Sequence, residues 1–200
     1  SYSVNVEYLK KAMPVPLTAA EIDVRLGATW VDPKYIEQFM MDVIQTPKRL
    51  FQREWVAVKY APITGEWNIK GKREDYNNPL ANSTYGTARI SAYQILENTL
   101  NLRDVKVYDR ITDVDGKEKS VINKEQTMLA TQKQDALKEA FKDWVFADQE
   151  RRDVLVEKYN ELYNSSKPRE YDGSHLSFPG MTPDRSEEHT SELQSLLVIS

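Results

Sequence analysis

The sequence predicts an α+β fold of two β-hairpins and about five helices, ending in an αα-hairpin and an irregular linker. Two segments, residues 55–69 and 105–122, alternate apolar and polar residues around a turn, which is typical of paired strands. Other segments space their apolar residues three and four apart, which is typical of helices. With 40% hydrophobic residues, four Trp and eleven Tyr, the chain can fill a single core.

Residues 18–26 are predicted to form a short first helix. Thr18 is a favourable N-cap, Glu21 closes a capping box three residues later, and Gly27 supplies a stop. A second helix is predicted over residues 33–46, because an Asp-Pro pair provides a cap followed by proline at the first helical position. The apolar face of this second helix consists of Ile36, Phe39, Met40, Val43 and Ile44.

The first hairpin follows at residues 55–69, with a PITG turn at residues 62–65. Its strand-forming residues are Trp55, Val56, Val58, Tyr60, Trp67 and Ile69. Residues 71–86 lack periodicity and are rich in Asn, so they are predicted to form a long loop. Loops of this length are more often functional than accidental.

A third helix is predicted over residues 91–101, and the second hairpin then turns at Asp115 and Gly116. Asn123 caps a long helix and Asp148 caps the next, so these two helices are predicted to pack as the αα-hairpin. Five Pro and Gly residues interrupt the sequence after residue 164, which predicts a linker.

These patterns divide the chain into four parts. Residues 1–16 are a lead-in, residues 17–164 an α+β domain, and residues 165–184 a linker toward a further domain. The string RSEEHTSELQS at residues 185–195 matches the in-frame translation of a sequencing adapter, residue for residue. We therefore expect residues 185–200 to be an artefact of library DNA, and the natural protein to continue beyond this chain.

The composition limits the classes of function. The formal net charge is −4, and leaving out the one Arg and three Glu of residues 185–200 gives −2, so any phosphate binding must come from a local patch. The chain has no cysteine, which excludes disulfides, thiolate metal sites and a cysteine nucleophile, and favours the cytoplasm. No apolar run reaches the roughly 18 residues of a membrane span, so no membrane contact is predicted.

Sequence patterns predict no catalytic, cofactor-binding or metal-binding residue. Gly71 and Lys72 resemble the end of a phosphate-binding loop, but the first glycine and the final hydroxyl of that motif are missing. Asn78-Pro79 resembles a base-holding element of amino-methyltransferases, but its second proline and aromatic residue are absent. His175 has no second metal-binding or catalytic partner nearby in the sequence.

One group of residues is a candidate for nucleic-acid binding, because cationic side chains neutralise phosphates and aromatic rings stack on bases. The group consists of Trp67, Lys70, Lys72, Arg73 and Tyr76. Glu74 and Asp75 weaken this interpretation. The alternative is a solvated hairpin tip, since clusters of this size occur on most soluble surfaces.

Several segments, in order, resemble one protein family. They are LTAAEIDVRLGATWVDPKYIEQFM from residue 17, TGEWNIKGK from residue 64, TYGTARISAYQILENTLNLRDVKVYD from residue 84, and the later strings PREYDGSH and FPGM. Together they resemble the large adenine-specific DNA methylase and Swi/Snf-type helicase proteins of conjugative elements and phages, including phage antirestriction proteins. The resemblance covers almost all of residues 4–183.

This resemblance implies a connector between a methylase-like region and a helicase motor. The parent protein would use ATP, magnesium and S-adenosylmethionine, but none of the catalytic residues of the family falls in this sequence. DNA and the neighbouring methylase and helicase domains are the implied partners. We therefore expect a non-catalytic inter-domain segment that assists DNA engagement or domain coupling. The alternative is a structural spacer or a small protein-interaction module without DNA contact.

Overall fold

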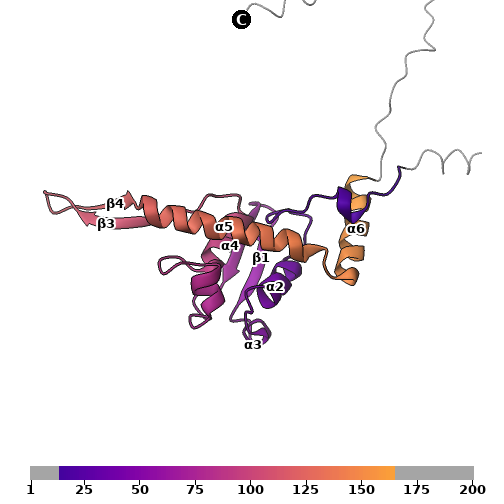
Figure 1. Ribbon diagram of the computed structural model, residues 1–200, viewed down its shortest axis with the longest axis horizontal. Coiled ribbons are helices and arrows are strands. Elements are labelled where there is room, and N and C mark those ends of the chain that lie inside the picture. Colours follow the sequence, from indigo (N-terminus) through magenta and orange to yellow (C-terminus); the bar gives the residue numbers. More distant parts are fainter. Residues whose placement is uncertain (1–13, 165–200) are drawn as a thin grey trace, which may run out of the picture. The chain divides into compact units, whose positions relative to one another are not determined.

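The computed structural model describes residues 14–164 (Figure 1). Its elements in chain order are η1 (Ala19–Glu21), α2 (Pro33–Asp42), α3 (Lys48–Gln52), β1 (Ala57–Ala61), β2 (Glu66–Lys70), η2 (Leu80–Thr84), α4 (Ala92–Leu100), β3 (Tyr108–Thr112), β4 (Glu118–Ile122), α5 (Lys124–Val145) and α6 (Gln149–Tyr163). The predicted α+β class with two antiparallel hairpins is confirmed. The predicted linker, the adapter-like string and His175 lie outside the described residues.

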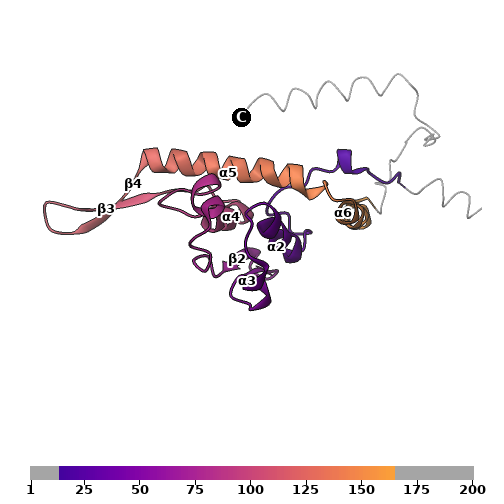
Figure 2. The ribbon, with the colours of Figure 1, turned by 60° about the horizontal axis from the view of Figure 1, so that its bottom comes forward.

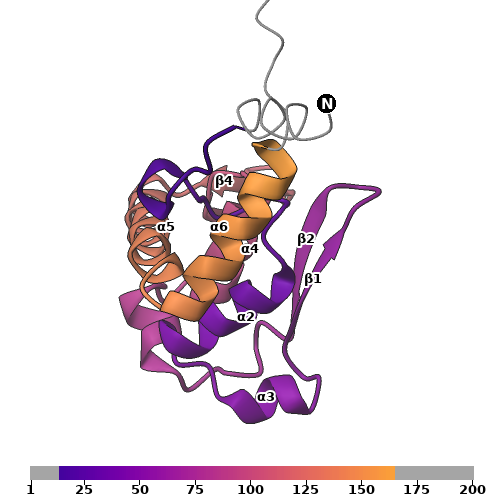
Figure 3. The same cartoon turned by 90° about the vertical axis from the view of Figure 1, so that its right-hand side faces the viewer.

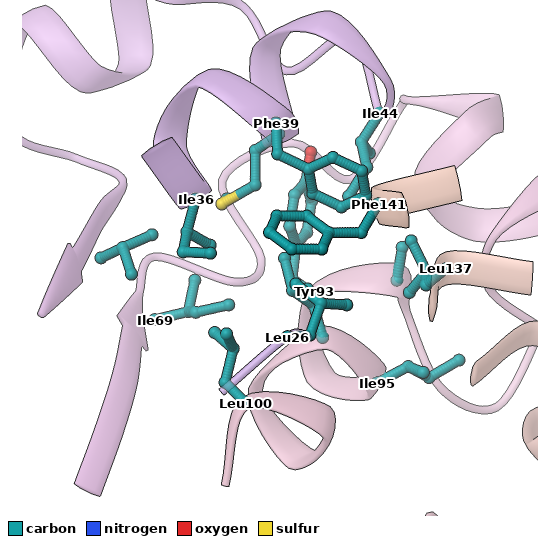
Figure 4. Packing of buried hydrophobic residues seen from close by; sticks show 14 of the residues in the cluster. Leu26, Ile36, Phe39, Ile44, Ile69, Tyr93, Ile95, Leu100, Leu137 and Phe141 are labelled. Atoms are coloured by element: carbon teal, nitrogen blue, oxygen red, sulfur yellow. The ribbon is translucent and has the colours of Figure 1, made fainter. Parts of the chain in front are cut away.

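The core forms where α2, α4 and α5 meet the inner face of the β1–β2 hairpin (Figure 2). Phe39 of α2 and Phe141 of α5 meet edge to face, with ring centroids 5.3 Å apart and an interplanar angle of 83° (Figure 4). The largest fully buried side chains are Ile36, Phe39, Met40, Ile44, Ile69, Tyr93, Ile95, Leu96, Leu100, Leu137, Phe141 and Leu155. Segments from the whole described length therefore share one core.

The predicted first helix is reduced to one 3₁₀ turn, η1. The capping box is present, with the Thr18 N–H donating to Glu21 Oε2 at 2.8 Å. The chain then extends, and Ile22, Val24 and Leu26 are buried while the residues between them are exposed. The prediction of a helix over residues 18–26 was wrong because this alternation buries one side of an extended segment.

The predicted second helix is present as α2, which has Pro33 at its first turn and buries the expected Ile36, Phe39 and Met40. It ends at Asp42, four residues earlier than predicted. Helix α3 was not predicted; it begins directly after Pro47 and has only five residues. A helix this short shows too few turns for a periodic pattern.

The β1–β2 hairpin has the predicted position and turn. Paired residues share a face, and one face packs inward with Val58 opposite Ile69 and Tyr60 opposite Trp67. The other face, which includes Lys59 and Lys70, is exposed. The hairpin and the nearby α3 are seen in Figure 3.

The β3–β4 hairpin lies at the N-terminal end of α5, away from the β1–β2 hairpin (Figures 1 and 2). Its base is attached to the core: Val107, just before β3, is buried, and its carbonyl accepts a bond from the Asn123 N–H at 2.8 Å. Beyond the base the strands are exposed on both faces. Large apolar side chains on it that stay partly or fully exposed are Tyr108, Ile111, Val114, Val121 and Ile122.

The predicted caps of the two last helices are confirmed. Asn123 Oδ1 accepts the Gln126 N–H, and Asp148 Oδ1 accepts the Arg151 N–H. The helices follow each other through a short turn, as the predicted αα-hairpin requires, but α6 runs across the end of α5 rather than back along it (Figures 1 and 2). The N-terminal segment holds α6 there, since the Asn160 side chain bonds both backbone groups of Leu17.

Candidate nucleic-acid interface

Trp67, the first of the five candidate residues, belongs to the core. Only 4% of its surface is exposed, and its ring lies 4.8 Å from that of Tyr60. Trp67 shares the inner face of β2 with Ile69, because side chains two residues apart point to the same side of a strand. Its ring is therefore not accessible for stacking on a base.

A different tryptophan is exposed beside the candidate residues. Trp55 is 49% exposed, and the guanidinium of Arg53 lies over its ring, 5.1 Å from the centroid. Lys70 reaches the same segment, donating from Nζ to the carbonyl oxygen of Glu54 at 2.9 Å. Trp55 lies in a bend just before β1, where it is exposed while the next residue, Val56, is buried. The sequence pattern predicted Trp55 to be a strand residue, but β1 begins two residues later, at Ala57.

The exposed face of the β1–β2 hairpin carries two lysines. The residue pairs on this face are Ala57 with Lys70, Lys59 with Asn68, and Ala61 with Glu66. Lys59 and Lys70 thus lie on the same face of the hairpin, and Lys70 contacts the carbonyl of Glu54, the residue before Trp55. Residues 48–60 include four basic residues and one acidic residue, although the net charge of the whole chain is −4. The region is locally basic.

Arg73 and Tyr76 lie in the turns that follow β2, and both are exposed, Tyr76 by 73%. We call Arg53, Trp55, Lys59, Lys70, Arg73 and Tyr76 the basic–aromatic surface. Lys70 and Arg73 lie at the end of the hairpin opposite its turn, so they do not form the hairpin tip of the alternative interpretation, although both are exposed.

Lys72 points elsewhere. Its Nζ forms an ion pair with Glu97 Oε2 of α4 at 2.6 Å and donates to the Ile69 carbonyl at 3.0 Å. Lys70 and Lys72 therefore contact different neighbours, and the five candidate residues divide among the core, the hairpin surface and α4. Glu97 comes 25 residues after Lys72, so nothing in the local sequence signals this pairing.

The loop at residues 71–86 is structured, with successive turns and the π-helical turn η2. Asp75 points inward, because Oδ2 accepts bonds from the hydroxyl of Tyr93 at 2.6 Å and from Asn78 Nδ2 at 2.7 Å. Asn78 also donates to the Ile44 carbonyl, and its Oδ1 accepts the Leu80 N–H. These hydrogen bonds of the Asn78 side-chain amide hold the loop at residues 71–86 in place. They also turn the Asp75 carboxylate toward Tyr93 and Asn78.

Burial and the hydrogen bond to Asp75 raise the pKa of Tyr93 well above its ordinary value. The unfolded chain releases the hydroxyl proton of Tyr93 at about pH 10, whereas the folded chain still holds this proton there. The contribution of Tyr93 to stability should therefore be constant below about pH 10 and should fall above it, by up to about 1.4 kcal/mol per pH unit. Urea unfolding of the wild type and of Tyr93→Phe at a series of alkaline pH values measures this, and the variant should show the shallower decline. Parallel declines would contradict the prediction.

The other glycine-containing motifs of the sequence form turns. Gly71 has φ +72° in a turn, and further turns rather than a helix follow Lys72. Gly116 has φ +73° in the β3–β4 turn, where its N–H donates to the Asp113 carbonyl. Within residues 14–164 no cluster of three or more His, Asp or Glu could hold a metal ion. No helix in this part of the chain is both long and apolar enough to cross a membrane.

Comparison with known proteins gave one match. A family model described as a domain of unknown function, DUF8437, matches residues 25–165, which is more than half of the chain. A search of curated proteins and a search of solved structures gave no match. The match includes α2 to α6, and hence the whole basic–aromatic surface.

Proposed function

The chain belongs to the DUF8437 family, and we propose that this domain engages nucleic acid without catalysing a reaction. The observation that carries the proposal is the exposed Trp55 ring beneath Arg53, with Lys70 bound to the carbonyl of the preceding residue, Glu54. Cationic groups that follow a nucleic-acid backbone, with an accessible aromatic ring for a base, are the elements of single-strand binding.

Local backbone geometry fixes the position of Trp55 at the end of α3. Glu54 has φ +55°, a left-handed conformation that is unfavourable for residues other than glycine. The Glu54 carbonyl accepts the bond from Lys70, and Trp55 follows directly. This conformation closes the C-terminal end of α3, where the Glu54 N–H donates to the Phe51 carbonyl at 3.0 Å and the Trp55 N–H donates to the Leu50 carbonyl at 2.9 Å. The end of α3 therefore holds Trp55 beside the carbonyl that binds Lys70.

In the proposed context the domain connects a methylase region and a Swi/Snf-type helicase motor in one longer protein of a bacterial or phage mobile element. This part of the proposal is supported by the ordered sequence segments that resemble such proteins. ATP, magnesium and S-adenosylmethionine would then bind to the neighbouring domains. DNA and those domains would be the partners, in the cytoplasm.

Fluorescence anisotropy of a labelled single strand of about 20 nucleotides, titrated with the full chain, tests the proposal. Trp55→Ala should weaken binding by about 5- to 150-fold, which corresponds to about 1–3 kcal/mol of stacking. Removing charge with Lys70→Gln and Arg73→Gln should weaken binding and reduce its salt dependence. The logarithmic slope should fall by about 0.7 for each phosphate that the protein no longer neutralises.

A double variant, Lys117→Gln with Lys142→Gln, is the matched control. Both lysines are exposed, lie outside the basic–aromatic surface, and remove the same formal charge. If the control loses as much affinity as Lys70→Gln with Arg73→Gln, binding is non-specific. Absence of binding by the wild type at about 50 mM salt, where phosphate contacts are strong, would refute the proposal.

A second candidate function is a protein-interaction module without DNA contact. The exposed apolar residues of the β3–β4 hairpin favour it, because a two-stranded hairpin without a packed face is only marginally stable in water. A neighbouring domain of the same longer chain would cover the hairpin. In that case Ile111→Ser would weaken association with such a domain, and Trp55→Ala would not.

A further inference from the structure

A polar hollow of about 350 Å³ lies between α4 and the segments on either side of it. Its polar lining residues are Lys72, Arg89, Gln94, Glu97, Asn98 and Lys106. Three cationic side chains thus come from three separate segments: the turn after β2, the residues before α4 and the residues before β3. Gln94, Glu97 and Asn98 are spaced three and four apart, so α4 presents all three to the hollow.

The cations of the hollow outnumber its carboxylates. Glu97 pairs with Lys72 at 2.6 Å, and Asp109 pairs with Arg89 at 2.8 Å from outside the lining. In the described residues Lys106 forms no ion pair, and it is exposed. One full positive charge therefore faces the hollow without a counter-charge. A polar site with surplus cations attracts anions.

Hydrogen-bond geometry favours an oxyanion over a simple halide. Arg89 is already held, because its Nη2 donates to the Tyr108 carbonyl at 3.0 Å while Nη1 contacts Asp109. The Gln94 side chain is fixed by the Ser91 N–H, which donates to its Oε1 and leaves its NH₂ group as a donor. Positioned N–H donors and ammonium groups around one hollow suit the several acceptor oxygens of a phosphate.

We propose that this hollow binds a phosphate group through Lys106, Arg89 and Gln94, with Lys72 as a fourth contact. The volume is near the lower end of the range for small-molecule sites, about 300–1,000 Å³, and accommodates a phosphate with an attached sugar. The phosphate belongs either to a free phosphate compound or to a nucleic-acid strand. This inference does not depend on the basic–aromatic surface, from which Lys72 points away.

The test uses the full chain with two probes, inorganic phosphate by isothermal titration and a short oligothymidylate by anisotropy. Lys106→Gln is the main variant, because Lys106 is exposed and unpaired in the described structure and its replacement should not affect folding. It should weaken binding of at least one probe about fivefold or more, as expected for removal of a charged hydrogen bond, whereas Lys106→Arg should retain it. Lys117→Gln, an exposed lysine at the end of the β3–β4 hairpin, is the control.

The two probes separate the two sources. Saturable binding of inorganic phosphate that Lys106→Gln weakens assigns the hollow to free phosphate compounds. Weakened oligonucleotide binding without phosphate binding assigns it to a strand. The inference is overturned if Lys106→Gln leaves both probes unaffected or if Lys117→Gln has the same effect. Trp55→Ala tests the proposed function separately from the hollow. This variant should weaken oligonucleotide binding and leave the binding of inorganic phosphate unchanged.

Discussion

Replacing Phe141 with alanine is expected to lower the free energy of unfolding by about 3–5 kcal/mol. The side chain is fully buried in α5, and its ring packs edge to face on Phe39, 5.3 Å between centroids. Removing the ring loses the free energy gained when the ring is transferred from water to the core, and it leaves a cavity between α2 and α5. Since domains have only about 5–15 kcal/mol of stability, this variant should be close to unfolding. Urea denaturation followed by circular dichroism measures the change.

Met128→Ala is the control for this substitution. Met128 lies on the same helix and is 59% exposed, so its replacement should change stability by no more than about 0.5 kcal/mol. Helix propensity differs little between the two substitutions. If Phe141→Ala and Met128→Ala lowered the free energy of unfolding equally, the effect would come from the helix itself. The packing of α5 on α2 would then not stabilise the fold.

The elements that sequence reasoning predicted well have strong local signals. Asn123 and Asp148 cap their helices as expected, because a cap involves only the next few residues. The two hairpins were also predicted, since strand alternation and the turn at residues 62–65 are local patterns. The capping box of Thr18 was identified correctly, yet the helix after it does not form. There the core requires alternating burial, and tertiary packing overrides a local helix signal.

The candidate site was predicted less well, for two different reasons. Trp67 could have been excluded, because the alternation that predicts the hairpin also places it beside Ile69 on the inner face. The pairing of Lys72 with Glu97 could not have been predicted, since it depends on where α4 packs against β2. The hydrogen bond between Lys70 and the Glu54 carbonyl likewise requires the folded hairpin. Charge and aromatic content can be read from the sequence, whereas packing determines which of these side chains remain exposed.

Gly71→Ala is expected to lower the free energy of unfolding by at least about 2 kcal/mol and to weaken nucleic-acid binding as well. Gly71 has φ +72°, and an added Cβ would lie 2.0 Å from the carbonyl oxygen of Trp55. That atom belongs to the backbone, so the clash can be relieved only by separating residue 71 from the segment that carries Trp55. Such a shift also moves the exposed indole relative to Lys70.

Gly65→Ala separates the two causes. Gly65 has a similar φ of +69°, but nothing lies within 4 Å of the position of its Cβ. It should therefore show only the conformational cost, about 1 kcal/mol, and bind the labelled strand with wild-type affinity. Urea denaturation and anisotropy on both variants give the comparison. Equal destabilisation would mean that the close approach of Gly71 to Trp55 is unimportant, whereas a destabilised Gly71→Ala variant with unchanged affinity would show that the position of Trp55 does not control binding.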